Sequence, residues 1–146
     1  MDTVGYLAPT SDTEAQEAFA ELEPVARELV REIAVAMDAS GELYTESVSD
    51  DVIETAQEAL FGSLLVVATG PRERFDHWTA QPPHEDYEID IEGSEHVDRI
   101  AWHTAPAAER IVAATYHAER EAAIATLRRI AWGRIYHDLL EGERTE

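Results

Sequence analysis

The chain contains no cysteine and no lysine. Without cysteine it cannot form disulfides, thiolate nucleophiles or cysteine-ligated zinc and iron–sulfur sites. All 11 basic residues are arginine, and 31 acidic residues give the 146-residue chain a net charge of -20. No apolar run reaches the roughly 18 residues of a transmembrane helix, and no basic and apolar leader opens the chain. These absences predict a cytoplasmic protein that does not enter a membrane.

The acidic excess extends over the whole chain. Residues 1–73 carry 16 acids and 3 arginines, a net charge of -13, and residues 74–146 carry 15 acids and 8 arginines, a net charge of -7. In molar salt the Debye length falls to about 3 Å, so such a surface no longer repels itself. We therefore predict adaptation to concentrated salt. The alternative is a nucleic-acid mimic or a partner for a basic protein, but the acids are interspersed with apolar residues rather than grouped. Direct binding of nucleic acid is disfavoured by the charge.

Two helical segments are predicted in the first half of the chain. Apolar residues recur every three or four positions over residues 12–38, and Ser11 has the spacing of an N-cap. Pro24 interrupts this run without breaking its phase, which predicts a kink or short break between collinear pieces. Ser49 is expected to cap a second, shorter helix that ends near Gly62.

Three strands are expected to follow. Residues 64–68 are uniformly apolar and predict a buried strand, and residues 71–86, with three prolines, are expected to be irregular. Residues 87–92 and 97–103 predict a β-hairpin in which Ile89 pairs with Ile100 and Asp90 lies opposite Arg99.

One long helix is predicted from Thr104, with Pro106 in its first turn, to about Leu140. Its apolar residues occupy two sides, which predicts that it is packed on two sides. The predicted fold is a single α+β domain over residues 1–146. In it, a small antiparallel β-sheet of at least three strands is covered by two long helices and one shorter helix.

No motif of catalysis or cofactor binding is present. The chain has no HExxH motif, no complete GxSxG elbow, no GxGxxG and no P-loop. His84, Glu85, Asp86 and His96 could converge on a metal, but polar residues are common in loops, and solvated side chains are the simpler interpretation. We predict no catalytic residue, no metal and no cofactor.

Residues 122–137 contain no acid, although the chain has 31. Arginines in such a stretch either meet the negative end of a helix and pair within the fold, or form a surface for an acidic partner, a ligand anion or a second copy of the chain. Two further arginines follow the predicted strand at 64–68. The candidate interface or anion-binding residues are Arg120, Arg128, Arg129, Trp132, Arg134, Arg72 and Arg74.

Three stretches carry a family resemblance: AATYHAEREAAIATLRRIAWGRIY at Ala113–Tyr136, VVATGPRER at Val66–Arg74 and GSEHVDRIAWHT at Gly93–Thr104. They resemble a small family of uncharacterised proteins from halophilic archaea, over most of the chain after about residue 50. The resemblance implies a salt-loving, cytoplasmic protein and no particular activity.

Two functions remain open from the sequence. The first is a non-enzymatic interaction or structural protein, a homodimer through Trp132 and Arg128 or Arg129 on the last helix. The second is a protein or enzyme that binds a small anionic ligand through its arginines. Arginines converging in a cleft without carboxylate partners would favour the second, whereas a flat, symmetric helical surface would favour the first.

Overall fold

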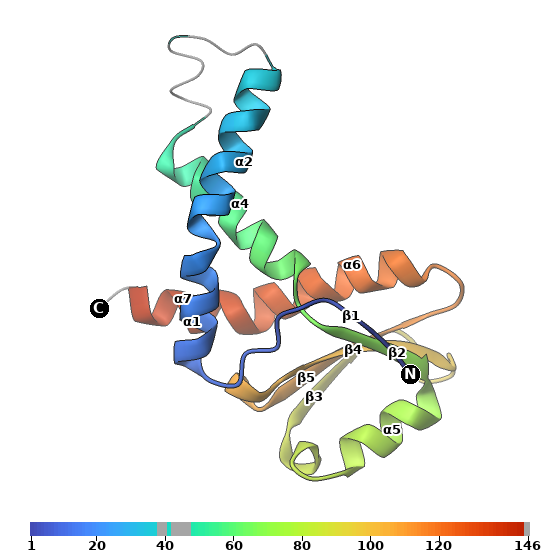
Figure 1. The fold of residues 1–146 in the computed structure, drawn as a ribbon. Helices are drawn as coiled ribbons and strands as arrows, with labels where there is room; N and C mark the ends of the chain where they lie inside the picture. Colours follow the sequence, from blue (N-terminus) through green and yellow to red (C-terminus); the bar gives the residue numbers. More distant parts are fainter. Residues whose placement is uncertain (38–40, 42–47, 145–146) are drawn as a thin grey trace.

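A mixed five-stranded sheet lies at the centre of the computed structural model, which describes residues 1–37, 41 and 48–144 (Figure 1). The order of strands across the sheet is β1-β2-β4-β5-β3. All neighbours are antiparallel except β3 and β5, which run parallel. The strands are β1 (Asp2–Val4), β2 (Val67–Pro71), β3 (Glu88–Glu92), β4 (Arg99–Ala105) and β5 (Arg110–Tyr116).

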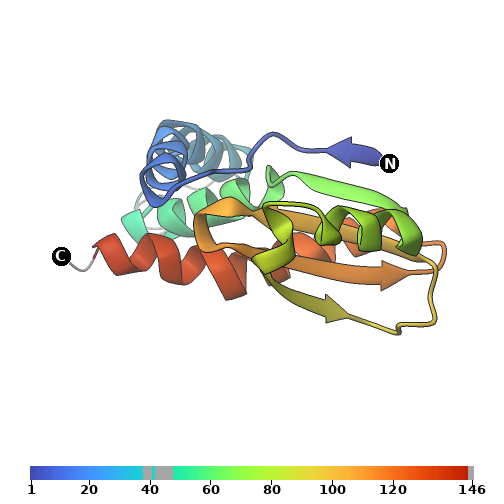
Figure 2. The same ribbon diagram turned by 90° about the horizontal axis from the view of Figure 1, so that it is seen from below.

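Helices cover both faces of this sheet. On one face lies α6 (Arg120–Ala131), which continues through the π-helical turn η3 (Trp132–Tyr136) into α7 (His137–Arg144). On the other face lies α5 (Arg72–Ala80), seen in front of the strands in Figure 2. A short 3-10 turn, η1 (His84–Asp86), lies between α5 and β3, and a second, η2 (Pro106–Ala108), joins β4 to β5. The α+β class is therefore confirmed.

The central strand β4 shows how the sequence divides the core between the two faces. Successive side chains of a strand point to opposite faces. Ile100 and Trp102 accordingly pack with Phe75 of α5, whereas Ala101 and Ala105 belong to the core beneath α6. Because both faces of the sheet are covered, the strand has buried apolar residues at both odd-numbered and even-numbered positions.

Three helices form the N-terminal part: α1 (Asp12–Glu21), α2 (Glu23–Ala36) and α4 (Asp50–Ser63). The predicted break is confirmed, since α1 ends before Leu22 and Pro24 occupies the first turn of α2. The predicted caps are also confirmed: Ser11 Oγ accepts from the Glu14 amide at 3.1 Å and Ser49 Oγ from the Val52 amide at 3.3 Å. In Figure 1, α2 and α4 form a hairpin that projects away from the sheet.

The hairpin has a small core of its own. Ala26, Val30 and Ile53 are buried there, and no sheet residue contributes to this cluster. The two helices are thus held together largely by each other along their outer part. No helix in the described ranges is both long and apolar enough to cross a membrane.

The prediction of one helix over residues 104–140 was wrong in its first third. Residues 110–116 form β5, and α6 begins only at Arg120. Ile111, Val112, Ala113 and Ala114 are all buried, the pattern of a strand covered on both faces. Val112 and Tyr116 also have helical spacing, which is why periodicity misassigned them.

The predicted β-hairpin was wrong as well. Strand β3 lies beside β5, so Ile89 is opposite Ile111 and not Ile100. Arg99 is opposite Tyr116, and Asp90 has Val112 as its partner in the register. The antiparallel sheet predicted from this hairpin is consequently a mixed sheet.

Two boundaries also differ from the prediction. Residues 72–80 of the segment expected to be irregular form α5, because Phe75 and Trp78 find apolar partners on the sheet. The strand expected at 64–68 is β2 at Val67–Pro71, since α4 extends to Ser63.

Candidate functional site

The seven residues predicted to form an interface or anion site lie in three separate places. Arg128, Arg129 and Trp132 line one groove between α4 and α6. Arg134 joins an ion-pair network at the edge of the sheet. The other three arginines lie near β2: Arg72 and Arg74 at the start of α5, and Arg120 at the start of α6. The acid-free stretch is therefore not one site.

The groove is mainly apolar and has a volume of about 450 Å³. One wall is the exposed side of α4, and the other is α6 with the first residue of η3. It is large enough for a small ligand or several side chains of a partner. The lining residues are Thr55, Glu58, Ala59, Gly62, Ser63, Ala125, Arg128, Arg129 and Trp132.

Arg128 lies at the edge of the groove and is held in place by the main chain. Its Nε donates a hydrogen bond to the carbonyl oxygen of Leu65 at 3.0 Å. Partial burial lowers the pKa of the Arg128 guanidinium, and the charge of Glu121 acts in the opposite direction. The side chain stays charged, because arginine does not lose its proton in proteins. A partly desolvated cation of this kind favours contact with an anion.

Arg129 is the more exposed of the two arginines. Among residues 1–37, 41 and 48–144, neither Arg128 nor Arg129 forms an ion pair, although Glu58 also lines the groove. Other arginines of this acidic chain do form such pairs, for example Arg27 with Glu23 at 2.7 Å. The groove therefore has two cations available for a carboxylate from outside the fold.

Trp132 lines the groove and belongs in part to the core. Its ring stacks on Phe19 with centroids 6.2 Å apart and meets Phe61 edge-on at 5.7 Å. The side chain remains partly exposed. Trp132 thus supports the fold as well as the groove, so its loss would disturb both.

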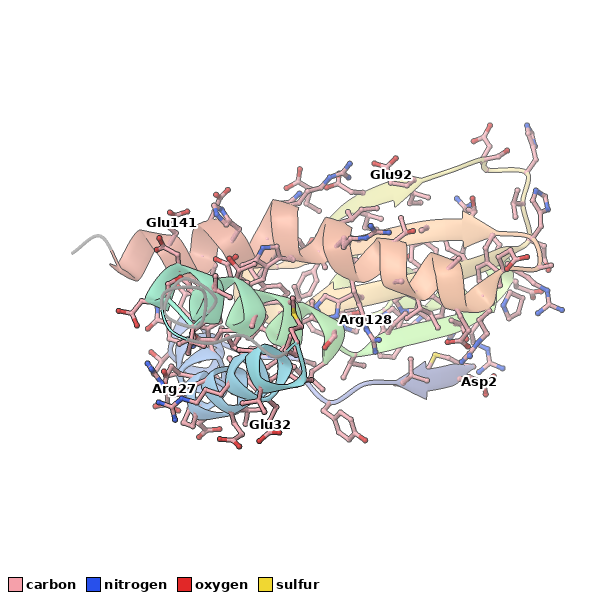
Figure 3. The ribbon with its side chains drawn as sticks, turned by 90° about the horizontal axis from the view of Figure 1, so that it is seen from above. Asp2, Arg27, Glu32, Glu92, Arg128 and Glu141 are labelled. Carbon is pink, nitrogen blue, oxygen red and sulfur yellow. The ribbon has the colours of Figure 1, made fainter. Side chains whose placement is uncertain are left out.

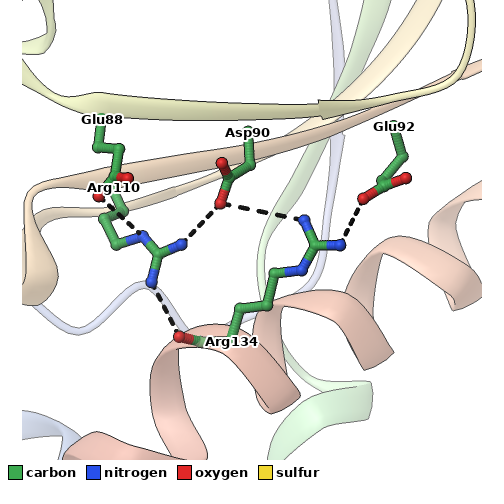
Figure 4. A network of polar contacts seen from close by, with 5 residues as sticks. All are labelled: Glu88, Asp90, Glu92, Arg110 and Arg134. Carbon is green, nitrogen blue, oxygen red and sulfur yellow. Dashed lines mark hydrogen bonds and ion pairs between the residues drawn. The ribbon is translucent and has the colours of Figure 1, made fainter.

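Arg134 is engaged elsewhere (Figure 4). Its guanidinium pairs with Glu92 and lies 3.9 Å from Asp90, both on the edge strand β3. Arg110 of β5 binds Asp90 at 2.6 Å and donates to the carbonyl oxygen of Arg134 at 2.9 Å. These contacts join β3 to β5 and η3, which is a structural role.

Two of the three remaining predicted arginines also have local contacts. Arg72 lies 3.5 Å from Asp76 and over the ring of Phe75. Arg120 pairs with Glu121 at 2.7 Å and donates to the Thr69 hydroxyl at 3.4 Å. Arg74 is exposed on α5, on the opposite face of the sheet from the α4–α6 groove. None of the three contributes to that groove.

The sequence did not identify a buried polar pair beneath α6. Tyr136 donates to His103 Nε2 at 2.6 Å, and His103 Nδ1 donates to the carbonyl oxygen of Val66 at 2.6 Å, an assignment that follows because a carbonyl only accepts. Burial lowers the pKa of His103 to about 4 and raises that of Tyr136. The one sign of this pair in the sequence was His103, a histidine among the mainly apolar residues of β4. With both nitrogens occupied, His103 is a structural residue.

The proposed metal ligands are not brought together. His84 stacks on Trp78 with centroids 4.5 Å apart and meets Tyr87 edge-on. Within the ranges that the structure describes, no three histidine or acidic side chains are placed to hold a metal ion. His96 lies in the exposed turn after β3, where it contacts Glu95.

Comparison with known proteins identifies a family without an assigned activity. A family model described as "Family of unknown function (DUF5809)" matches residues 6–137. No curated protein and no solved structure matches the chain.

Proposed function

The chain belongs to this family of unknown function, and we propose from its geometry that it is a non-enzymatic binding protein. Its binding site is the groove between α4 and α6, and its target is an apolar group that carries a carboxylate. The observation that supports this is the presence of Arg128 and Arg129 at an apolar groove without ion pairs among the described residues. Apolar contact supplies the affinity, and the arginines supply the preference for an anion.

A binding role is favoured over catalysis because the groove offers few reactive groups. Ser63 is exposed at its rim, and its hydroxyl donates to the carbonyl oxygen of Leu60 at 2.8 Å. Among the described residues that line the groove there is no histidine, and Glu58 is the one carboxylate. Nucleophilic catalysis needs a nucleophile with an adjacent base, and the groove lining lacks this pair.

We also propose that the protein works in the cytoplasm of a cell with concentrated internal salt. The net charge of -20 and the absence of lysine support a high-salt setting. The absence of cysteine fits a compartment in which disulfides do not form.

Binding can be tested with octanoate, a probe that has an apolar chain and a carboxylate. In NMR titrations in 1 M KCl, octanoate is expected to shift the Trp132 indole signal and the methyl signals of Ala59 and Ala125. Octanol, the matched uncharged probe, is expected to bind on the order of ten-fold more weakly because it cannot pair with an arginine. Equal binding of the two probes, or the absence of shifts at Trp132, Ala59 and Ala125, would contradict the proposal.

Two variants locate the binding. Ala125 is exposed, so Ala125→Trp should fill the groove without disturbing the core, and octanoate binding should be lost. Arg129→Gln should weaken octanoate and leave octanol unchanged. Arg74→Gln is the control, since Arg74 is an exposed arginine on the opposite face of the sheet.

A further inference from the structure

The projecting hairpin exposes apolar side chains that its own fold does not cover. Val25, Leu29 and Ile33 follow one another at intervals of four residues on α2 and are 53%, 41% and 49% exposed. The buried face of α2, which packs on α4, is formed by Ala26, Val30 and Ala34. Val52, near the start of the neighbouring helix α4, is also 40% exposed. We refer to Val25, Leu29, Ile33 and Val52 as the apolar stripe.

The apolar stripe and the groove face the same side of the molecule. Val25 and Leu29 are each two residues from Arg27, which places them about 200° around the helix from it. Figure 3, which looks along the hairpin, shows Arg27 on one side of it and Arg128 on the other. The stripe therefore points away from Arg27, toward the side on which Arg128 lies.

We propose that the occupant of the groove is the apolar stripe of a second copy of this chain, in a two-fold symmetric dimer. In such a dimer the α2 stripe of each copy packs into the α4–α6 groove of the other, so the contact forms twice. This inference rests on the proposed binding role of the groove and names its partner.

Charge complementarity selects a second copy as the partner. Glu28 and Glu32 lie three residues after Val25 and Leu29, so they border the stripe. Figure 3 shows Glu32 at the outer edge of the hairpin. Neither glutamate has an ion pair among the described residues. The stripe is thus apolar with an acidic border, and the groove is apolar with a basic border at Arg128 and Arg129, so each copy carries both halves of the contact.

The size of a stable interface also requires both surfaces. Specific dimers bury about 800 Å² on each partner, more than one face of a short helix offers. The helix α2 has only 14 residues. A two-fold contact adds the groove to the stripe on each copy, and so uses the apolar surface of α2, α4 and α6 together.

The first test removes the apolar stripe. We expect the wild-type protein to form dimers in 1 M KCl, measured by sedimentation velocity over a dilution series. Leu29→Ser with Ile33→Ser should weaken dimerisation on the order of thirty-fold or more, because exposed apolar anchors become buried at the contact. Val35→Ser is the matched control: Val35 is 63% exposed on the same helix but lies about 200° around from Ile33. Circular dichroism should show all variants folded.

The second test exchanges the charges. Glu32→Arg and Arg129→Glu should each weaken dimerisation, because each places like charges at both contacts. A mixture of the two single variants should recover a dimer: one of its contacts is wild type and the other has the charges exchanged. In the control mixture, Arg74→Glu should dimerise by itself because its contacts are unchanged, but it should not restore dimerisation of the Glu32→Arg chain, since Arg74 belongs to α5 on the opposite face of the sheet.

The outcomes separate this inference from the proposed function. A wild type that stays monomeric at every concentration, or a dimer unaffected by the stripe variant, overturns the inference. If octanoate still binds the groove in that case, the proposed function stands. If the stripe variant is monomeric and binds octanoate more tightly than the wild type, both are supported, because the partner no longer occupies the groove.

Discussion

At the scale of single residues, His103 shows how a polar side chain is accommodated in the core. It is 1% exposed on the central strand β4, and both ring nitrogens are hydrogen-bonded. Protonation would add a proton to Nε2, which accepts a hydrogen bond from Tyr136. It would also place a positive charge in an apolar region, where the charge of Arg128 would repel it. The fold therefore binds the neutral ring, and acid opposes folding at this residue.

This residue predicts a pH dependence of stability. The folded-state pKa of His103 is about 4 against an ordinary value of 6.5, so the unfolded chain binds a proton more readily. The contribution of His103 to the unfolding free energy is complete above pH 6.5 and decreases as the pH falls toward 4. Between pH 7 and pH 5 the wild type should lose about 2 kcal/mol more unfolding free energy than His103→Gln.

The measurement is urea denaturation in 1 M KCl at pH 7, 6 and 5. His77→Gln serves as the control, because His77 is exposed and should leave the wild-type slope unchanged. If the unfolding free energy of the wild type and of His103→Gln changes equally with pH, then His103 does not titrate as its burial implies.

At the scale of elements, local signals predicted helices better than strand partners. Capping serines and Pro24 defined α1, α2 and α4, since these signals act within a few residues. The pairing of β3 with β5 could not be predicted, because β4 intervenes in the chain and a hairpin is the ordinary local solution. Of the residues that line the groove, Arg128, Arg129 and Trp132 lie in the acid-free stretch, and their role in binding stays a prediction. The opposite wall, with Ala59 and Ser63, depends on long-range packing that no local pattern encodes.

The attachment of β3 gives the prediction at this scale. Asp90→Asn weakens the pair with Arg110 and should reduce the unfolding free energy by about 1 kcal/mol, since this pair is only partly buried. Amide hydrogen exchange should accelerate in β3 and stay unchanged in α6. Asp86→Asn makes the same chemical change at an exposed residue and should have no effect. Equal acceleration in β3 and α6 would mean that the pair stabilises the whole fold rather than the edge strand.

At the scale of the whole molecule, the charge of -20 dominates. Arginine ion pairs among the described residues involve Arg27, Arg72, Arg110, Arg120 and Arg134, and the chain has 31 acids against 11 arginines, so negative charges are in large excess. Their mutual repulsion opposes the compact state in dilute buffer and is screened in concentrated salt.

We therefore expect the thermal midpoint to rise steeply from dilute buffer to molar KCl. A triple variant, Glu17→Gln with Asp51→Asn and Glu73→Gln, removes three exposed charges. Its thermal midpoint should rise less than that of the wild type over the same range of KCl. Differential scanning calorimetry measures both. A midpoint that stays constant or falls with KCl would contradict a high-salt setting.

The position of β5 between β3 and β4 has a consequence for the order of folding. Strand β3 precedes β4 and β5 in the chain, yet among the described strands it pairs with β5, which is the last strand to be synthesised. During synthesis, therefore, Ile89 and Ile91 cannot be docked until the β4–β5 hairpin exists. Closing the sheet is then a non-local step, of the kind that raises contact order and slows folding. Acidic residues alternate along β3. Before β3 pairs with β5, we expect these charges to keep the strand hydrated and to disfavour its pairing with another nascent chain.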